Sequence, residues 1–227
     1  MNAPKQSGFA SRSILLVLCA ALAAGLGLMA AQRYFGKPAA ADAAAAPKLY
    51  AVTRIAPARE LPAFELQSSD GTALTAKHLQ GHWTVVFLGF THCPDVCPTT
   101  LSELAKAQNA WKDIPAPKRP RILFVSVDPD RDTPKLTGEY ARYFHPETLA
   151  ATADEPALSA FARGLGLVYM KSPLPGGDYT MDHSATLVVL DPQGRQAGLI
   201  RPNPPPKQPL DARGIADDLR KLTEAAP

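Results

Sequence analysis

One stretch near the middle of the chain constrains the fold more than any other. Residues Val85 to Phe90 form an apolar run rich in β-branched and aromatic side chains, which predicts a strand covered on both faces. Pro98 follows as the favoured first residue of a helix over Thr99 to Trp111. Cys93 and Cys97 therefore lie on a tight connection between a central strand and a helix N-terminus.

The position of the two cysteines indicates sulfur chemistry but leaves its kind open. They are separated by about one helical turn, so both sulfurs can face the same point. A helix N-terminus favours the thiolate, so we predict a lowered thiol pKa for Cys97. Because a thiolate is both a nucleophile and a soft metal ligand, a disulfide, a redox couple and a metal site all remain open.

The charge balance argues against a nucleic-acid partner. The chain carries a formal net charge of +3. Four of its 24 Lys and Arg residues and one of its 21 Asp and Glu residues precede Lys48, so the rest of the chain is formally neutral. A nucleic-acid-binding domain carries a basic field, and none is predicted here.

An apolar run near the N-terminus predicts a single-pass membrane anchor. Ile14 to Ala31 contains no charge and matches the length that crosses a bilayer, about 17–25 residues. Lys5 and Arg12 precede it and favour a cytoplasmic N-terminus. We therefore expect residues 1–13 in the cytoplasm and residues 14–35 as a transmembrane anchor of a bacterial inner membrane.

Export of the following domain does not depend on retention of this anchor. The alanines around Ala44 leave a cleaved signal peptide as the alternative, and it would export the same domain. Outside the cytoplasm a thiol pair meets oxidising conditions. We expect the domain in the periplasm, with Cys93 and Cys97 exposed to those conditions.

The order of predicted elements indicates a mixed α/β fold. Residues 36–57, rich in Ala and Pro, read as a flexible linker, and residues 58–227 as the folded domain. Strands are predicted at Ile122 to Val127, Val168 to Lys171, Ala185 to Leu190 and Gln196 to Arg201, with a hairpin that turns at Asp70-Gly71; helices are predicted at Pro134 to Phe144, Pro156 to Gly164 and Asp211 to Leu222. Such alternation predicts a three-layer body with helices flanking a mixed sheet. The cysteines after its first long buried strand resemble the thioredoxin arrangement.

A histidine late in the chain bears on the choice between redox and metal chemistry. His183 precedes the predicted strand Ala185 to Leu190. In thioredoxin-like folds this loop packs against the active cysteines, and oxidoreductases place a cis-proline there. Those enzymes also usually carry two residues between their cysteines, whereas three separate Cys93 from Cys97. Two thiolates and one imidazole form a soft trigonal set suited to copper.

Three motifs together resemble the Sco/SenC family of copper chaperones. They are Gly89-Phe90-Thr91-His92-Cys93-Pro94-Asp95-Val96-Cys97-Pro98, Val127-Asp128-Pro129-Asp130-Arg131-Asp132-Thr133 and Asp182-His183-Ser184. The resemblance implies a membrane-tethered, thioredoxin-like domain whose copper ligands are Cys93, Cys97 and His183. It also implies that Cys93 and Cys97 can form a redox disulfide.

The resemblance further implies a function and partners. The domain would bind Cu(I) or Cu(II) and deliver copper to the Cu(A) site of cytochrome c oxidase subunit II or to another cuproprotein. It would exchange with other copper chaperones or thiol reductases. A chaperone of this kind is not an enzyme. The alternative is a thiol-disulfide oxidoreductase that keeps cuproprotein cysteines reduced.

Two acidic residues are candidates for supporting roles around the site. Asp128 follows a buried strand, close to Arg131, and either forms an internal ion pair in a turn or shapes the loop beside the copper ligands. Asp95 lies between the cysteines and either tunes the charge of the site or faces a partner.

Overall fold

The computed structural model describes residues 9–35, 47–203 and 210–225, which fall into two units, residues 1–46 and 47–227. In the first unit, helix α1 (Phe9–Phe35) contains the window Ile14–Ala31, with a mean hydropathy of 2.5. This helix is long and apolar enough to cross a membrane. The first part of the predicted linker, residues 36–46, lies outside the described residues.

The second unit is built on a mixed sheet of eight strands, in the order β1-β10-β9-β4-β5-β6-β2-β3. At its centre β4 (Thr84–Gly89) pairs in parallel with β5 (Arg121–Ser126), and every residue of β4 is buried. The continuous apolar runs predicted this, because a strand with both faces covered has no need for polar alternation. β6 (Leu149–Thr152), which the sequence analysis missed, continues the parallel part.

The outer strands run antiparallel and make the sheet mixed, as predicted. On one side of β4 lie β9 (Leu187–Leu190) and β10 (Gln196–Ile200), and on the other side β6 is followed by β2 (Glu65–Ser68) and β3 (Ala73–Thr75). The predicted hairpin at Asp70-Gly71 is confirmed by the pairing of β2 with β3, and Gly71 adopts a φ of 82° in its turn.

The predicted boundary between linker and domain was wrong. Strand β1 (Val52–Arg59) pairs antiparallel with β10, although residues 52–57 of it were assigned to the linker. Most of its side chains are not buried, so the segment lacks a core-forming pattern. It is an edge strand, held by main-chain hydrogen bonds to β10 and by burial of Val52.

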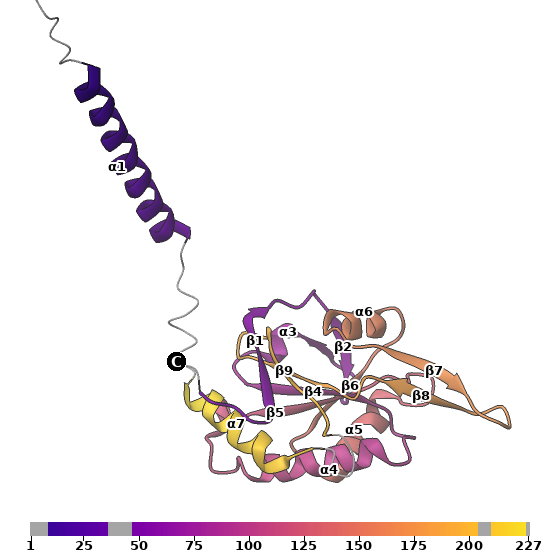
Figure 1. Ribbon diagram of the computed structural model, residues 1–227. Helices are drawn as coiled ribbons and strands as arrows, with labels where there is room; N and C mark the ends of the chain where they lie inside the picture. Colours follow the sequence, from indigo (N-terminus) through magenta and orange to yellow (C-terminus); the bar gives the residue numbers. More distant parts are fainter. Residues whose placement is uncertain (1–8, 36–46, 204–209, 226–227) are drawn as a thin grey trace, which may run out of the picture. The chain divides into compact units, whose positions relative to one another are not determined.

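Helices cover both faces of this sheet (Figure 1). One face carries α4 (Val96–Asn109), α5 (Pro134–Phe144) and α7 (Ala212–Ala225), and the other carries α6 (Ala157–Gly164). Two short helices, α3 (Ala76–Leu79) and η1 (Ala116–Lys118), precede β4 and β5. The result is the predicted thioredoxin-like α/β fold, with the strand β4 leading directly into the cysteines.

A second, two-stranded sheet projects from this body (Figure 1). It consists of β7 (Tyr169–Pro173) and β8 (Tyr179–His183), paired antiparallel so that Tyr169 lies opposite His183. β7 lies near its predicted place, but residues 182–183 were expected in a loop and instead end β8. This hairpin brings His183 to the main sheet.

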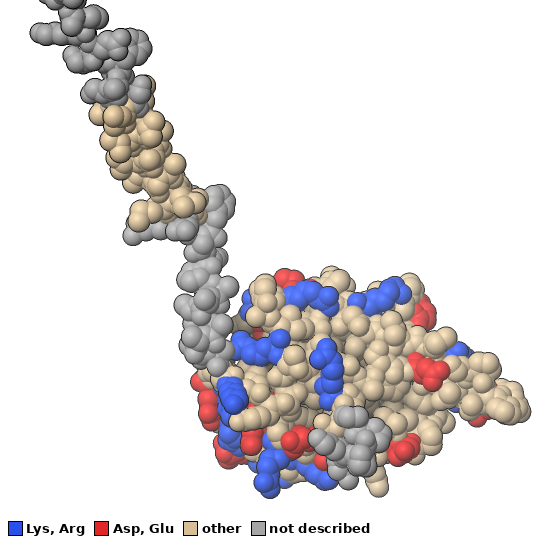
Figure 2. All heavy atoms as spheres, in the orientation of Figure 1, with Lys and Arg blue, Asp and Glu red and all other residues tan. Residues whose placement is uncertain are grey.

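Charged side chains of both signs are interspersed over the face of the second unit drawn in Figure 2. Neither sign covers the whole face, in keeping with the formal neutrality of this part of the sequence.

Candidate metal centre

The two cysteines lie where β4 passes into α4. Helix α4 begins at Val96, with Asp95 at the N-cap position, so it starts two residues before the predicted Pro98. Cys97 therefore lies inside the first turn, and its backbone N–H donates to the Cys93 Sγ over 3.3 Å. Both residues are free thiols; Cys97 is fully buried and Cys93 is partly exposed. The inner sulfur of Cys97 thus lies in the first turn of α4, and the outer sulfur of Cys93 lies in the loop just before it.

Gly89, the last residue of β4, makes room for the inner sulfur. A Cβ atom built at Gly89 would lie 3.0 Å from the Cys97 Sγ and 2.8 Å from the Phe124 Cε2. Real Cβ atoms essentially never approach as closely as 2.8 Å, and 3.0 Å is tighter than nine in ten real contacts. Glycine therefore fits between the Phe124 ring and the sulfur, where alanine would not without a shift. The sequence analysis included Gly89 in a motif but did not assign it this role.

His183 faces the inner cysteine across 86 positions of sequence. Its Nε2 lies 3.7 Å from the Cys97 Sγ, and its Nδ1 lies 3.2 Å from the carbonyl oxygen of Ser184. A carbonyl only accepts hydrogen bonds, so Nδ1 carries the proton and Nε2 presents its lone pair to the sulfur. The rings of Phe87 and Phe90 pack against the imidazole with edge geometry. This tautomer is the one that a metal ligand needs.

Burial decides the protonation of both groups. Desolvation lowers the pKa of His183, which keeps the imidazole neutral. Desolvation, followed by the hydrogen bond with Cys93, raises the pKa of the Cys97 thiol. The predicted lowering of this thiol pKa was therefore wrong, because burial of the sulfur outweighs the helix N-terminus. Cys97 is therefore a protonated thiol in the metal-free chain, and a metal ion must displace this proton to bind the sulfur.

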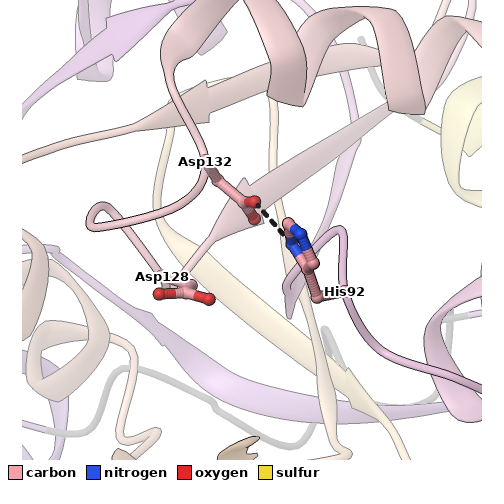
Figure 3. Close-up of side chains that lie close together, drawn as sticks. All are labelled: His92, Asp128 and Asp132. Carbon is pink, nitrogen blue, oxygen red and sulfur yellow. Dashed lines mark ion pairs between the residues drawn. The ribbon is translucent and has the colours of Figure 1, made fainter. Parts of the chain in front are cut away.

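A second cluster consists of His92, which directly precedes Cys93 in the sequence, and the carboxylates of Asp128 and Asp132 (Figure 3). The His92 imidazole points toward Asp132, with Nδ1 3.6 Å from the Asp132 Oδ1. The fully buried Asp132 carboxylate also accepts hydrogen bonds from the backbone and hydroxyl of Thr91 and from the hydroxyl of Ser126. Asp132 thus fastens the start of the cysteine loop to the end of β5, a role that sequence reasoning missed.

The two supporting acidic residues differ in their surroundings. Asp128 is buried and forms an ion pair with Arg131, with Oδ2 2.6 Å from the Arg131 Nε. Its Oδ1 accepts a hydrogen bond from the Tyr179 hydroxyl over 2.8 Å. The internal ion pair considered from the sequence is therefore present, and it reaches the hairpin that carries His183. Asp95 is exposed at the start of α4 and makes no side-chain capping bond.

The Cys97 sulfur and the His183 nitrogen lie at a distance that one metal ion can bridge. With a metal–thiolate bond of about 2.3 Å, a metal–imidazole bond of about 2.0 Å and a trigonal angle, sulfur and nitrogen lie about 3.7 Å apart. The Cys97 Sγ and the His183 Nε2 are separated by 3.7 Å, close to that value. The outer sulfur of Cys93 adjoins them through its bond to the Cys97 N–H. The distances therefore suit a metal ion shared by Cys97 and His183, with the Cys93 sulfur next to the Cys97 backbone.

The sequence is similar to a SCO1 homolog and to a protein named as copper-binding. The SCO1 homolog 1 of Arabidopsis thaliana is 37% identical over 135 residues, which cover 57% of this chain and 39% of that protein. A putative copper-binding protein of Stutzerimonas stutzeri is 33% identical over 145 residues, 63% of this chain and 70% of the relative. The chain thus spans well under half of the Arabidopsis protein.

The fold has a solved counterpart over the same region. The crystal structure of Arabidopsis thaliana ScoI with copper bound superposes with a TM-score of 0.63 at 31% identity, covering 72% of this chain and 98% of that one. The family model described as SCO1/SenC matches residues 52–222, from the start of β1 into α7. That match spans more than half of the sequence, and the chain belongs to the SCO1/SenC family.

Proposed function

We propose that this chain is a membrane-tethered copper chaperone whose copper ligands are Cys93, Cys97 and His183. The observation that carries the proposal is the approach of the His183 Nε2 to the Cys97 Sγ, 3.7 Å apart, with the lone pair facing the thiol. Support comes from a relative named as copper-binding and from the Arabidopsis structure solved with copper bound.

Copper is the cargo, and the chemistry of the donors explains the choice. Thiolate and imidazole are soft to intermediate ligands, and a trigonal set of this kind suits Cu(I) while also accommodating Cu(II). Burial keeps His183 neutral and available as a ligand, and it holds Cys97 as a thiol until metal displaces the proton.

Transfer by ligand exchange would begin at the outer sulfur. Cys93 is partly exposed and Cys97 is fully buried, so an incoming thiolate of a partner reaches copper from the side of Cys93. The proposed recipient is the Cu(A) site of cytochrome c oxidase subunit II or another cuproprotein, with other copper chaperones or thiol reductases as exchange partners. Family membership supports this assignment.

We place the chain in a bacterial inner membrane, with its folded domain in the periplasm. The apolar window of α1 has the length of a single span, and Lys5 and Arg12 precede it on the side assigned to the cytoplasm. In this arrangement residues 1–13 are cytoplasmic and α1 tethers the domain at the membrane surface. Tethering confines the chaperone to the plane in which a membrane-bound recipient lies.

Asp128 and Asp95 are assigned supporting roles of different kinds. Asp128 bonds to Arg131 and to the Tyr179 hydroxyl, which supports a role in shaping the surroundings of the metal ligands. Asp95, exposed between the two cysteines, is placed to contact a partner that approaches the outer sulfur.

The alternative is a thiol-disulfide oxidoreductase that reduces cuproprotein cysteines. The contact that favours it is the hydrogen bond from the Cys97 N–H to the Cys93 Sγ, because it holds the partly exposed sulfur beside its potential disulfide partner. A disulfide between Cys93 and Cys97 removes two of the three copper ligands. Copper loading and disulfide formation are therefore mutually exclusive.

A copper titration separates the two functions. The full chain, reduced in detergent, is titrated with Cu(I) against a competing chelator, alongside Cys93→Ser, Cys97→Ser and His183→Ala. The chaperone assignment predicts loss of tight binding in all three variants. Unchanged copper affinity in His183→Ala, together with intact disulfide reductase activity, would instead support the oxidoreductase.

A further inference from the structure

His183 lies at the end of a hairpin that is not part of the main sheet. The strand β8 has five residues, Tyr179 to His183, and pairs only with β7 among the described strands. Alternate residues of a strand share a face, so Tyr179 lies on the same face as His183. Anything that fixes Tyr179 therefore fixes the direction and rotation of the strand that presents the imidazole.

Arg131 holds Tyr179 from the loop after β5. Its Nη1 donates to the carbonyl oxygen of Tyr179 over 3.2 Å and lies 3.4 Å from the Asp178 Oδ1. Its guanidinium carbon is 3.8 Å from the centroid of the Tyr179 ring. At the same time its Nε donates to the Asp128 Oδ2 over 2.6 Å. One side chain thus joins the loop to the start of β8.

Lys171 and Asp128 make further contacts with the Tyr179 side chain. The Lys171 Nζ lies 3.7 Å from the same Tyr179 centroid and 2.7 Å from the Asp130 Oδ2. Two cations so close to one centroid occupy its opposite faces. The Tyr179 hydroxyl donates to the Asp128 Oδ1 over 2.8 Å, so ring, hydroxyl and main chain of one residue are all engaged.

Burial makes Arg131 the strongest of these links. Its side chain is 20% exposed and that of Asp128 is 2% exposed, whereas Lys171 and Asp130 are 50% and 68% exposed. Exposed pairs are screened by water and contribute little, and partly buried, directed pairs contribute more. Arg131 also lies 6.0 Å from the Phe90 ring, which packs against the His183 imidazole.

We propose that Arg131, acting with Asp128 on Tyr179, is a positioning residue that holds the β7–β8 hairpin so that His183 meets the two cysteines. The inference rests on the proposed copper-binding function and adds to it what sets the place of the nitrogen ligand. Lysine cannot replace this arginine, because a single ammonium cannot bond the carboxylate, the carbonyl and the ring face together.

The test compares Arg131→Lys with a matched control, Arg220→Lys, in the full chain in detergent. Arg220 likewise joins a carboxylate, Asp113, to a backbone carbonyl, that of Ala110, but it does so between α7 and the end of α4. We expect Arg131→Lys to weaken Cu(I) affinity about tenfold, the usual size of a loss when support for a ligand is removed. Arg220→Lys should bind Cu(I) as the unchanged chain does.

Two further readouts separate positioning from general loss of structure. In the metal-free chain, amide hydrogen exchange over residues 169–183 should accelerate in Arg131→Lys and stay unchanged in Arg220→Lys. In a His183→Ala background, Arg131→Lys should weaken Cu(I) binding no further, because the ligand it positions is gone. Equal exchange in both arginine variants, or an undiminished effect of Arg131→Lys without His183, would overturn the proposal.

Tyr179→Phe keeps the proposal testable if Arg131→Lys does not fold. It retains the stacked ring and removes only the hydroxyl bond to Asp128, so a smaller loss of Cu(I) affinity than in His183→Ala is expected, with faster exchange in the hairpin. Wild-type affinity and exchange in Tyr179→Phe would count against the proposal. Failure of His183→Ala to lower Cu(I) affinity would refute the copper site itself, and that outcome is distinct.

Discussion

Replacing Gly89 by alanine should displace the Cys97 sulfur and weaken the proposed copper site. The added Cβ would lie 2.8 Å from the Phe124 Cε2 and 3.0 Å from the Cys97 Sγ, whereas ordinary contacts begin at 3.4 Å. Phe124 and Cys97 are both fully buried, so the ring and the sulfur must both shift, the sulfur by a few tenths of an ångström. The Cys97 Sγ would then leave its place opposite His183.

The energetic cost follows from packing and chain entropy. Forcing one extra methyl group into a packed core costs about 1–3 kcal/mol. Alanine recovers about 0.5–1 kcal/mol of that, because glycine loses more backbone freedom on folding. The difference is a net loss of at most about 2.5 kcal/mol in the free energy of unfolding, or at most about 10 °C in Tm. Copper affinity should fall by about 10- to 100-fold, since a ligand is displaced.

Gly198→Ala is the matched control for this experiment. Gly198 also lies in a strand, β10, and its added Cβ would lie 2.7 Å from the Val52 Cγ1, with none of the proposed copper ligands among its nearest atoms. Thermal unfolding and Cu(I) competition are measured on both variants. We expect both to lose Tm and only Gly89→Ala to lose copper affinity. Retention of copper by Gly89→Ala, or equal losses in both, would refute the reasoning about the sulfur.

Three further outcomes follow from buried groups. The fully buried Asp218 carboxylate accepts hydrogen bonds from the N–H groups of Tyr50, Ala51 and Val52. Asp218→Ala should therefore lower the free energy of unfolding by about 3–4 kcal/mol in denaturant titrations, and Asp218→Asn, which keeps an acceptor without the charge, by about half of that. Equal losses in the two variants would refute a contribution from the charge of the carboxylate. Because the pKa of His183 is lowered on folding, the unfolded chain binds more protons, so metal-free stability should fall as pH drops below about 6.5, with a shallower dependence in His183→Asn; identical pH curves would contradict this. Since the pKa of the Cys97 thiol is raised, Cu(I) binding should release a proton and weaken as pH falls, and a pH-independent affinity would contradict it.

The centre of the fold was predictable because its signal is local. The strands β4 and β5 are continuous apolar runs, and the start of α4 lies close to a proline. Strand β1 was missed because its exposed side chains resemble a linker, and its pairing with β10 joins distant parts of the chain. Strand β8 was missed for a similar reason, since its pairing partner and Arg131 hold it in place.

In the candidate site, too, the features encoded locally were predictable and those that depend on distant parts of the chain were not. The residues Cys93, Cys97 and His183 were identified from motifs, and the structure brings the imidazole against the inner sulfur. The protonation of Cys97 could not be predicted, because the depth of burial of one sulfur depends on the whole core around it. The close approach of Gly89 to the Cys97 sulfur and the hydrogen bonds of the Asp132 carboxylate could likewise not be predicted, because they form only when β4 and β5 lie side by side.

X-ray absorption at the copper edge tests the central assignment most directly. The reduced full chain is loaded with one equivalent of Cu(I), and the ligands are counted from the extended fine structure. The account predicts two sulfur ligands and one imidazole nitrogen, with the nitrogen contribution lost in His183→Ala. A shell of sulfur alone in the unchanged chain, or a nitrogen contribution that survives in His183→Ala, would contradict a site made by Cys93, Cys97 and His183.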